Sequence, residues 1–201
     1  LRRGKSSTHI KFGESTAVLA GNSLLTMAFE ILSDKSLKIH EKIKIKLISR
    51  LSKCAGHSGI AGGQYLDLSF EKKKVSKKKI IQMQIKKTGK LFSFCSMVPA
   101  IIKNKDKKTI NNFARIGYDI GLLFQITDDL IDFSGETKKA GKKTKKDHKQ
   151  GKATLISLLG YENTVKYTNK LKLNLFKKLI KYGSKSKNIN ESLEFILNRN
   201  R

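Results

Sequence analysis

Hydrophobic residues recur at three- and four-residue steps along most of the chain. Between Glu14 and Leu32, this spacing places Val18, Leu25 and Phe29 on one side of a helix. The same pattern predicts further helices over residues 37–54, 91–102, 107–133, about 161–182 and 188–198. No segment shows the two-residue alternation of a half-buried strand, so the sequence predicts an all-α protein.

Turn-forming and flexible residues mark the expected ends of these helices. The segment Ser33-Asp34-Lys35-Ser36 would end one helix and supply the N-cap of the next. Glycines make residues 56–63 a break, and residues 134–152 combine glycine and lysine without apolar periodicity, which predicts a loop. The single proline, Pro99, is expected to kink or end its helix.

Length and cysteine content narrow the class of protein. With 201 residues, the expectation is a single domain over residues 1–201. Cys54 and Cys95 support neither a disulfide scaffold nor a cysteine-ligated zinc site. We find no apolar run of membrane-span length and no signal peptide, and therefore expect a soluble, cytoplasmic protein. The chain starts with Leu1 and not with Met, which we interpret as the start of a fragment.

The net charge is strongly positive. Lys and Arg total 43 against 16 Asp and Glu, which gives +27 and suggests a nucleic-acid partner. Only six of these cations are arginine, tryptophan is absent, and the lysines are scattered through the predicted helices. Nucleic-acid readers rely on arginine and on aromatic side chains. We therefore predict no nucleic-acid partner, and keep a basic helical nucleic-acid-binding protein as the weakest alternative.

Three carboxylates lie together at the end of the longest predicted helix. Asp128 and Asp132 are one helical turn apart and face the same way, with Asp129 beside them. Such a cluster is self-repelling at neutral pH unless a divalent cation binds to it. Oxygen ligands favour Mg²⁺, which commonly shares its coordination sphere with phosphate. The alternative is a solvated polar face of the helix.

Cations lie near this cluster and elsewhere in the chain. In Gly141-Lys142 and Gly151-Lys152 the glycine would let the loop fold close to an anionic ligand. Lys87-Thr88-Gly89 combines a cation, a hydroxyl and a flexible residue, and Arg2-Arg3 offers two guanidinium groups that suit phosphate oxygens. Together with a bound Mg²⁺, these groups suit a diphosphate. Solvated charges, a glycine kink and a frayed terminus are the alternatives.

In their order along the chain, these motifs resemble those of the short-chain trans-prenyl diphosphate synthases, and most of all the bacterial farnesyl diphosphate synthases. The resemblance runs through nearly all 201 residues. It is carried by Leu1-Arg2-Arg3-Gly4 to His9, Phe12-Gly13-Glu14, Leu19 to Leu25, Gly62-Gly63-Gln64 to Leu68, Lys87-Thr88-Gly89, Phe124 to Asp132, and Gly141-Lys142 to Thr154. The segment Phe124 to Asp132 resembles the second Asp-rich motif of that family. The family's first Asp-rich motif is absent, Asn22 replaces an Asp, and Leu155-Ile156 replaces Tyr-Pro.

The resemblance implies a fold and an activity. The fold would be an all-α, multi-helix bundle around a central prenyl-chain cavity, of which this chain is about the C-terminal two thirds, and a homodimer. The activity would be the Mg²⁺-dependent head-to-tail condensation of isopentenyl diphosphate with dimethylallyl or geranyl diphosphate to give farnesyl diphosphate, through an allylic carbocation. Without the first Asp-rich motif, the chain alone should be almost inactive. The alternative is a non-catalytic or degraded homologue, or a partner subunit.

The resemblance also implies roles for individual residues. Asp128, Asp129 and Asp132 would form the metal site, with Asp128 and Asp132 as the direct ligands. Arg2 would face the allylic diphosphate and Arg3 the isopentenyl diphosphate. The residues expected to contact the allylic diphosphate are Lys87, Thr88, Gln125, Lys142 and Lys152, of which the first four would be catalytic. Phe92 and Phe124 would line the prenyl-chain cavity.

Overall fold

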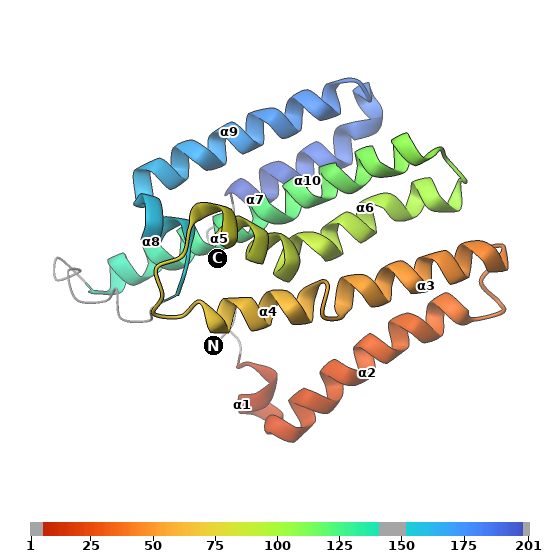
Figure 1. Cartoon of the computed structure of the whole chain (residues 1–201), viewed down its shortest axis with the longest axis horizontal. Helices are drawn as coiled ribbons and strands as arrows, with labels where there is room; N and C mark the ends of the chain where they lie inside the picture. Colours follow the sequence, from red (N-terminus) through yellow and green to blue (C-terminus); the bar gives the residue numbers. More distant parts are fainter. Residues whose placement is uncertain (1–5, 141–151, 199–201) are drawn as a thin grey trace. The chain divides into compact units, whose positions relative to one another are not determined.

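A computed structural model describes residues 6–140 and 152–198, with side chains over residues 6–134 and 152–198. This part of the chain consists of helices and connecting loops without a strand, so the all-α prediction is confirmed (Figure 1). The elements are α1 (Thr8–Phe12), α2 (Glu14–Ser33), α3 (Glu41–Ala55), α4 (Ile60–Ser69), α5 (Lys77–Gln84), η1 (Ile85–Gly89), α6 (Lys90–Ile102), α7 (Lys107–Ala140), α8 (Leu155–Leu159), α9 (Tyr161–Ile180), η4 (Gly183–Ser186) and α10 (Lys187–Asn198).

The described residues form two compact units, one within residues 1–50 and the other within residues 51–200. The boundary falls inside α3. The predicted single domain over residues 1–201 stays a prediction.

The first unit contains α1, α2 and most of α3. Gly13 joins α1 to α2 with a φ of 86°, a conformation that suits glycine because it has no Cβ. We expected no apolar segment long enough for a membrane span, but α2 is long and apolar enough by length and mean hydropathy. The small and polar residues of α2 interrupt every apolar run without lowering its mean hydropathy below this level. A single helix of this kind is weak evidence of a span.

The predicted boundary between the first two long helices is correct on one side only. Helix α2 ends at Ser33, and Asp34 Oδ1 accepts a hydrogen bond from the Ser36 backbone N–H at 2.7 Å. Ser36, however, does not cap α3, which begins at Glu41. His40 precedes α3, and its Nδ1 accepts from the Lys42 backbone N–H at 3.2 Å. The polar side chain next to the helix therefore satisfies the free backbone donor.

The second unit is organised around α7. This helix packs against α6, η1, α9 and α10, and Figure 1 shows α6, α7, α9 and α10 side by side. Helix α7 runs to Ala140, so the prediction of a loop from residue 134 is wrong for residues 134–140. The helix continues because the segment contains glutamate, lysine and alanine, which favour helix without any apolar stripe.

Two further predictions concern helix ends in this unit. Helix α4 begins at Ile60, so the glycine-rich break ends there and Gly62 and Gly63 lie inside a helix. Helix α6 ends at Ile102, as the apolar spacing predicted, so Pro99 does not end it, and the kink at Pro99 stays a prediction. In α4, Gly63 lies inside a helix because the backbone of Lys87 packs closely against it.

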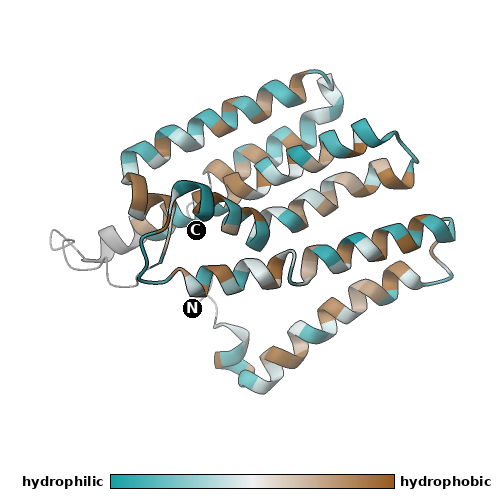
Figure 2. Cartoon of the chain, in the orientation of Figure 1, coloured by the Kyte–Doolittle hydropathy of each residue, from teal (hydrophilic) through white to brown (hydrophobic). Residues whose placement is uncertain are grey.

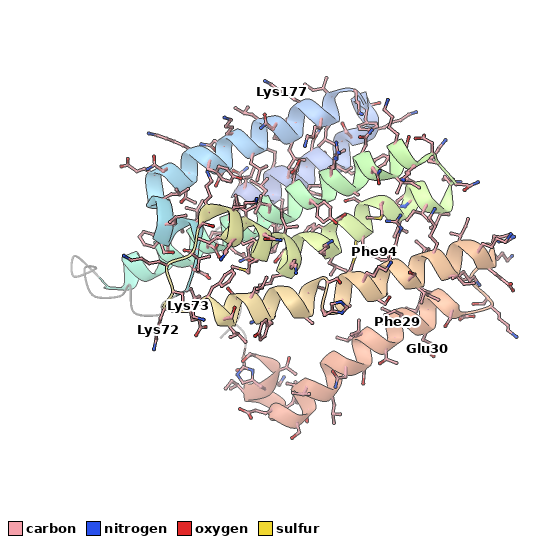
Figure 3. The ribbon with its side chains drawn as sticks, in the orientation of Figure 1. Phe29, Glu30, Lys72, Lys73, Phe94 and Lys177 are labelled. Carbon is pink, nitrogen blue, oxygen red and sulfur yellow. The ribbon has the colours of Figure 1, made fainter. Side chains whose placement is uncertain are left out.

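Aliphatic side chains form the core of the second unit, and lysines remain outside it. One buried cluster joins α7, α9 and α10 and consists of Ile116, Leu123, Leu175, Leu179 and Leu193. Another consists of Ile80, Leu122, Ile126, Ala153 and Leu155. Figure 2 shows hydrophilic and hydrophobic residues alternating along α9, in keeping with an amphipathic helix. Lys72, Lys73 and Lys177 are exposed and extend outward (Figure 3), as solvated charges do.

Candidate functional site

Lys87 and Thr88 lie in η1, a π-helical segment between α5 and α6. The helical path continues from α5 into α6, but over residues Ile85–Gly89 its turns are wider than those of an α-helix. A wider turn changes the directions in which the following side chains project. Such segments are rare in proteins and are often found at functional sites.

Glycines bring the backbones of two neighbouring helices against η1. A Cβ atom at residue 63, on α4, would lie 2.2 Å from the backbone N of Lys87. A Cβ atom at residue 121, on α7, would lie 2.6 Å from the Cα of Gly89. Both distances are far shorter than van der Waals contact, so only glycine allows these approaches. The π-helical segment is therefore fixed between α4 and α7.

Lys87 forms an ion pair that the sequence did not predict. Its Nζ lies 2.5 Å from Oδ2 of Asp67 on α4, and the two side chains are 31% and 18% exposed. The carboxylate holds the lysine in one orientation at the partly open surface of the site. An ammonium group has three N–H donors, and the single contact with Asp67 occupies one of them. Lys87 thus keeps donors for an anionic ligand.

A chain of side-chain hydrogen bonds links η1 to the acidic end of α7, by which we mean the part of its C-terminal half that contains Asp128, Asp129 and Asp132. Thr88 Oγ1 donates to Gln125 Oε1 at 2.8 Å, and Gln125 Nε2 donates to Asp129 Oδ1 at 3.1 Å. Gln84 Nε2, at the end of α5, donates to Asp129 Oδ2 at 2.9 Å. Both oxygens of Asp129 therefore accept amide N–H groups. Three residues beside the acidic cluster, Gln84, Thr88 and Gln125, are therefore linked to Asp129 and fixed relative to it.

Burial raises the pKa of Asp129 to about 7, because the ionised carboxylate is poorly solvated. The hydrogen bond from Gln125 lowers this pKa, whereas the negative charges of Asp132, Asp128 and Asp67 raise it further. The contribution of Asp67 shows that the acids of α7 and the acid of α4 act on the same region. The structure thus concentrates negative charge where α4, η1 and α7 meet.

The donor set at the end of α7 suits Mg²⁺ bound together with a diphosphate. Asp128 is partly exposed, Asp132 is exposed, and they lie one turn apart on α7. Asp129 is bonded to amides instead, and in the described part of the chain no three or more His, Cys, Asp or Glu residues are grouped so as to hold a metal ion. Mg²⁺ typically takes one or two protein carboxylates and completes its shell with water and substrate phosphates. Two carboxylates fit that requirement.

The other predicted site residues lie in several places. Lys152 is exposed and precedes α8. Phe92 on α6 and Phe124 on α7 pack against each other, with ring centroids 5.4 Å apart. Arg2, Arg3 and Lys142 lie outside the described residues.

Sequence reasoning did not name Asp67 and Gln84 as site residues. Asp67 belongs to a segment that was recognised as a motif, between Gly62 and Leu68, so its position was available. Gln84 had a weaker signal. It lies one helical turn after Ile80, and Ile80, Met83 and Gln84 are the buried residues of α5. A polar residue at a position that helical spacing assigns to the buried face must find a partner, and that partner is Asp129.

Comparison with known proteins gives a consistent result. The polyprenyl synthetase family model matches residues 1–194. The chain is 34% identical over 200 residues to a geranylgeranyl diphosphate synthase of Cyanophora paradoxa, and 34% identical over 200 residues to a farnesyl diphosphate synthase of Micrococcus luteus. These alignments cover 99% and 100% of this chain but 67% and 68% of the two relatives.

A solved structure supports the same assignment. The geranyltransferase of Helicobacter pylori, in complex with magnesium and isoprenyl diphosphate, aligns with a TM-score of 0.80 and 32% identity over 98% of this chain and 64% of that one. The chain thus spans about two thirds of the length of the proteins it resembles. With its all-α fold and these matches, the protein belongs to the polyprenyl synthetase family.

Proposed function

We propose that the protein is a Mg²⁺-dependent trans-prenyl diphosphate synthase, which condenses isopentenyl diphosphate with dimethylallyl or geranyl diphosphate to give farnesyl diphosphate. The observation that carries the proposal is the hydrogen-bonded chain between η1 and the acidic end of α7, with Lys87 beside it. It brings donors for a diphosphate and carboxylates for a cation into one region. The relatives named above make farnesyl and geranylgeranyl diphosphate, so the family alone leaves the product length open.

In this reaction the bond between C1 of the allylic substrate and the diphosphate oxygen breaks, and the electron pair leaves with the diphosphate. The isopentenyl double bond then attacks the allylic cation to form a carbon–carbon bond, and the departing diphosphate accepts the proton that the new cation loses. Fixed donors favour this reaction because they stabilise negative charge as it develops on the leaving group. No separate general base is needed.

The chain supplies these donors from η1 and α7. Lys87 would direct its remaining N–H donors towards the departing diphosphate, while Asp67 fixes the orientation of its side chain. The hydroxyl of Thr88 donates its hydrogen to Gln125 Oε1, which fixes the Gln125 amide before substrate binds, and the second N–H of Gln125 Nε2 stays available as a donor. Preorganised groups of this kind need no reorientation as charge develops.

The carboxylates of α7 would hold the cation. Asp128 and Asp132 would bind Mg²⁺, which neutralises charge on the diphosphate when it is bound. Asp129, whose oxygens are both bonded to amides, would support these ligands from inside the bundle and not bind the ion directly. Arg2, Arg3, Lys142 and Lys152 would contact the diphosphates. We further propose a homodimer in the cytoplasm.

The experiment is a product assay with the protein expressed from its complete reading frame. Labelled isopentenyl diphosphate and geranyl diphosphate are incubated with the enzyme in Mg²⁺ or in chelator, and the chain length of the product is determined. We expect a C15 diphosphate that requires Mg²⁺. Asp128→Asn should lower kcat/KM by about 100-fold or more, because a metal ligand loses its charge. Glu191→Gln, at an exposed acid on α10, is the matched control and should leave kcat/KM unchanged.

The outcomes separate the alternatives. A C20 product would keep the reaction and change the proposed product. Absence of any product from the folded protein would overturn the proposal and favour a non-catalytic homologue. Equal losses in Asp128→Asn and Glu191→Gln would show that the acidic end of α7 has no special role.

A further inference from the structure

Gln84 is a polar side chain on the buried face of α5, where an apolar residue would be more stable. It is 2% exposed, and its Nε2 donates to Asp129 Oδ2 at 2.9 Å. Its Oε1 is buried and has no hydrogen-bond partner. A buried amide oxygen without a partner is unfavourable, and an apolar residue of similar size would avoid that cost. The role of this amide must therefore lie in the hydrogen bond that its N–H donates to Asp129.

That N–H acts on Asp129 from outside α7. Asp129 Oδ1 accepts from Gln125, which lies one turn earlier on the same helix, so this bond alone moves with α7. Oδ2 accepts from Gln84 on α5, a residue 45 positions away in sequence. Two donors on two different oxygens, supplied by two different helices, fix the plane of the carboxylate. Without Gln84, only the bond from Gln125 on the same helix remains, and a change of χ1 could turn the carboxylate away from the bundle.

We propose that Gln84 is a positioning residue for the acidic end of α7, an inference that rests on the proposed function. By holding Asp129 inward, Gln84 keeps a third carboxylate out of the coordination sphere of the cation. Asp128 and Asp132 then present two carboxylates, and the diphosphate oxygens fill the remaining positions. Gln84 itself contacts neither the cation nor the substrate.

The test replaces the amide without creating a cavity. Gln84→Met has nearly the same length and volume but no N–H donor, and Gln82→Met is the matched control because Gln82 is exposed on the same helix. The first readout needs neither metal nor activity: hydrogen exchange of the Gln125 side-chain amide, followed by NMR in metal-free protein. Gln84→Met should accelerate this exchange at least about tenfold, since the acceptor of the amide is no longer fixed. Gln82→Met should leave it unchanged.

The second readout is the Mg²⁺ dependence of product formation. Gln84→Met should lower the Mg²⁺ concentration for half-maximal activity by about tenfold, because the freed carboxylate of Asp129 adds a negatively charged ligand beside the cation, while KM for geranyl diphosphate stays the same. A merely structural role would instead lower the fraction of folded enzyme and leave the Mg²⁺ midpoint where it was.

Each outcome decides the inference. Unchanged exchange at Gln125 in Gln84→Met, or an equal change in Gln82→Met, would overturn it. If the parent enzyme makes no product, the proposed function fails, and the exchange comparison still decides whether Gln84 fixes Asp129. Should Gln84→Met fail to fold, Gln84→Leu removes the donor with a smaller apolar side chain. Failure of both variants to fold would assign Gln84 a purely structural role and overturn the inference.

Discussion

Two of the contacts that α7 makes in the second unit differ in the groups that form them. Where α7 meets α9 and α10, it packs through aliphatic side chains, among them Leu123, Leu175 and Leu193. Where α7 meets η1, its backbone approaches that of Gly89 at Gly121, and the side chains beyond are joined by directional hydrogen bonds. The contact with α9 and α10 could accept other hydrophobic side chains of similar size. The contact with η1 needs specific donor and acceptor atoms at fixed positions.

The difference shows where stability and function are separated in this protein. Burial of a leucine contributes roughly 1.5–3 kcal/mol and does not depend on direction, so the contact with α9 and α10 stabilises the fold. The contact with η1 contains a buried carboxylate and an unpaired amide oxygen, both of which cost stability. The first contact must offset the cost of the second. Substitutions in the contact with α9 and α10 should therefore mainly lower the free energy of unfolding, and substitutions in the contact with η1 should mainly lower kcat/KM.

The largest expected effect concerns the buried charge of Asp129 in the metal-free protein. Its pKa is raised from 3.8 to about 7, so between these pH values the folded state binds the proton more tightly than the unfolded state. The free energy of unfolding should therefore fall as the pH rises through this window, by up to about 4 kcal/mol, and level off above it. The proton keeps Asp129 neutral beside Asp67, Asp128 and Asp132, the charges that act on it.

Asp129→Asn tests this expectation. The variant has no charge to bury, and its side-chain N–H can donate to Gln84 Oε1 if the Gln84 amide rotates, which would give that oxygen a partner. Urea unfolding at several pH values, without divalent cations, should show the parent losing stability relative to Asp129→Asn as the pH rises. Parallel pH curves for the two proteins would contradict a raised pKa. The variant is expected to gain stability and lose activity.

The second expected effect is a loss of stability without a loss of activity. Leu175 is fully buried between α9 and α7, so Leu175→Ala should lower the free energy of unfolding by about 3 kcal/mol through lost contacts and a residual cavity. At a temperature where the variant is folded, kcat/KM should remain within about twofold of the parent, because the contact with η1 is unchanged. A much larger loss of kcat/KM would show that the two contacts are coupled.

The third expected effect is a loss of activity through the contact of α4 with η1. In Gly63→Ala the new Cβ would overlap the backbone of Lys87, so α4 and η1 must separate and the orientation of Lys87 must change. We expect kcat/KM to fall by about 100-fold, equivalent to about 2.7 kcal/mol, and the free energy of unfolding to fall by about 1–3 kcal/mol, because backbone and not a flexible side chain must move. Steady-state kinetics and thermal melting of the same preparation check this. Unchanged kinetics would show that close contact between α4 and η1 is dispensable.

Periodicity predicted the fold because most helices bury an apolar stripe. The helix that begins at Lys107 and those around Tyr161 and Asn188 were predicted from spacing alone, and each is present. Errors occurred where helix formation depends on something other than a stripe. Helix α7 continues beyond Phe133 on helix-forming polar residues, and α4 contains Gly63 because a neighbouring backbone requires the space.

The candidate site was predictable to the extent that its chemistry is local in sequence. The spacing of Asp128 and Asp132 indicated two carboxylates on one face, and Lys87-Thr88-Gly89 stood out by composition. The bond between Gln84 and Asp129 could not be read from spacing, since it joins residues 45 positions apart. The inward orientation of Asp129 follows from that bond, whereas the spacing indicated only that Asp129 lies beside the pair Asp128 and Asp132.

The smallest expected effect concerns the lysines that give the chain its charge, and it separates solvated lysines from paired ones. Lys177 extends outward from α9 (Figure 3), whereas its neighbour Lys178 forms an ion pair with Asp119 of α7, with Nζ and Oδ2 2.5 Å apart. Lys178→Gln should lower the free energy of unfolding by roughly 0.2–1 kcal/mol, and less in high salt, because the pair is partly exposed. Lys177→Gln should change it by less than about 0.3 kcal/mol. Urea unfolding at low and high salt distinguishes the two, and an equal effect at both positions would mean that the ion pair adds nothing beyond the bulk charge of the surface.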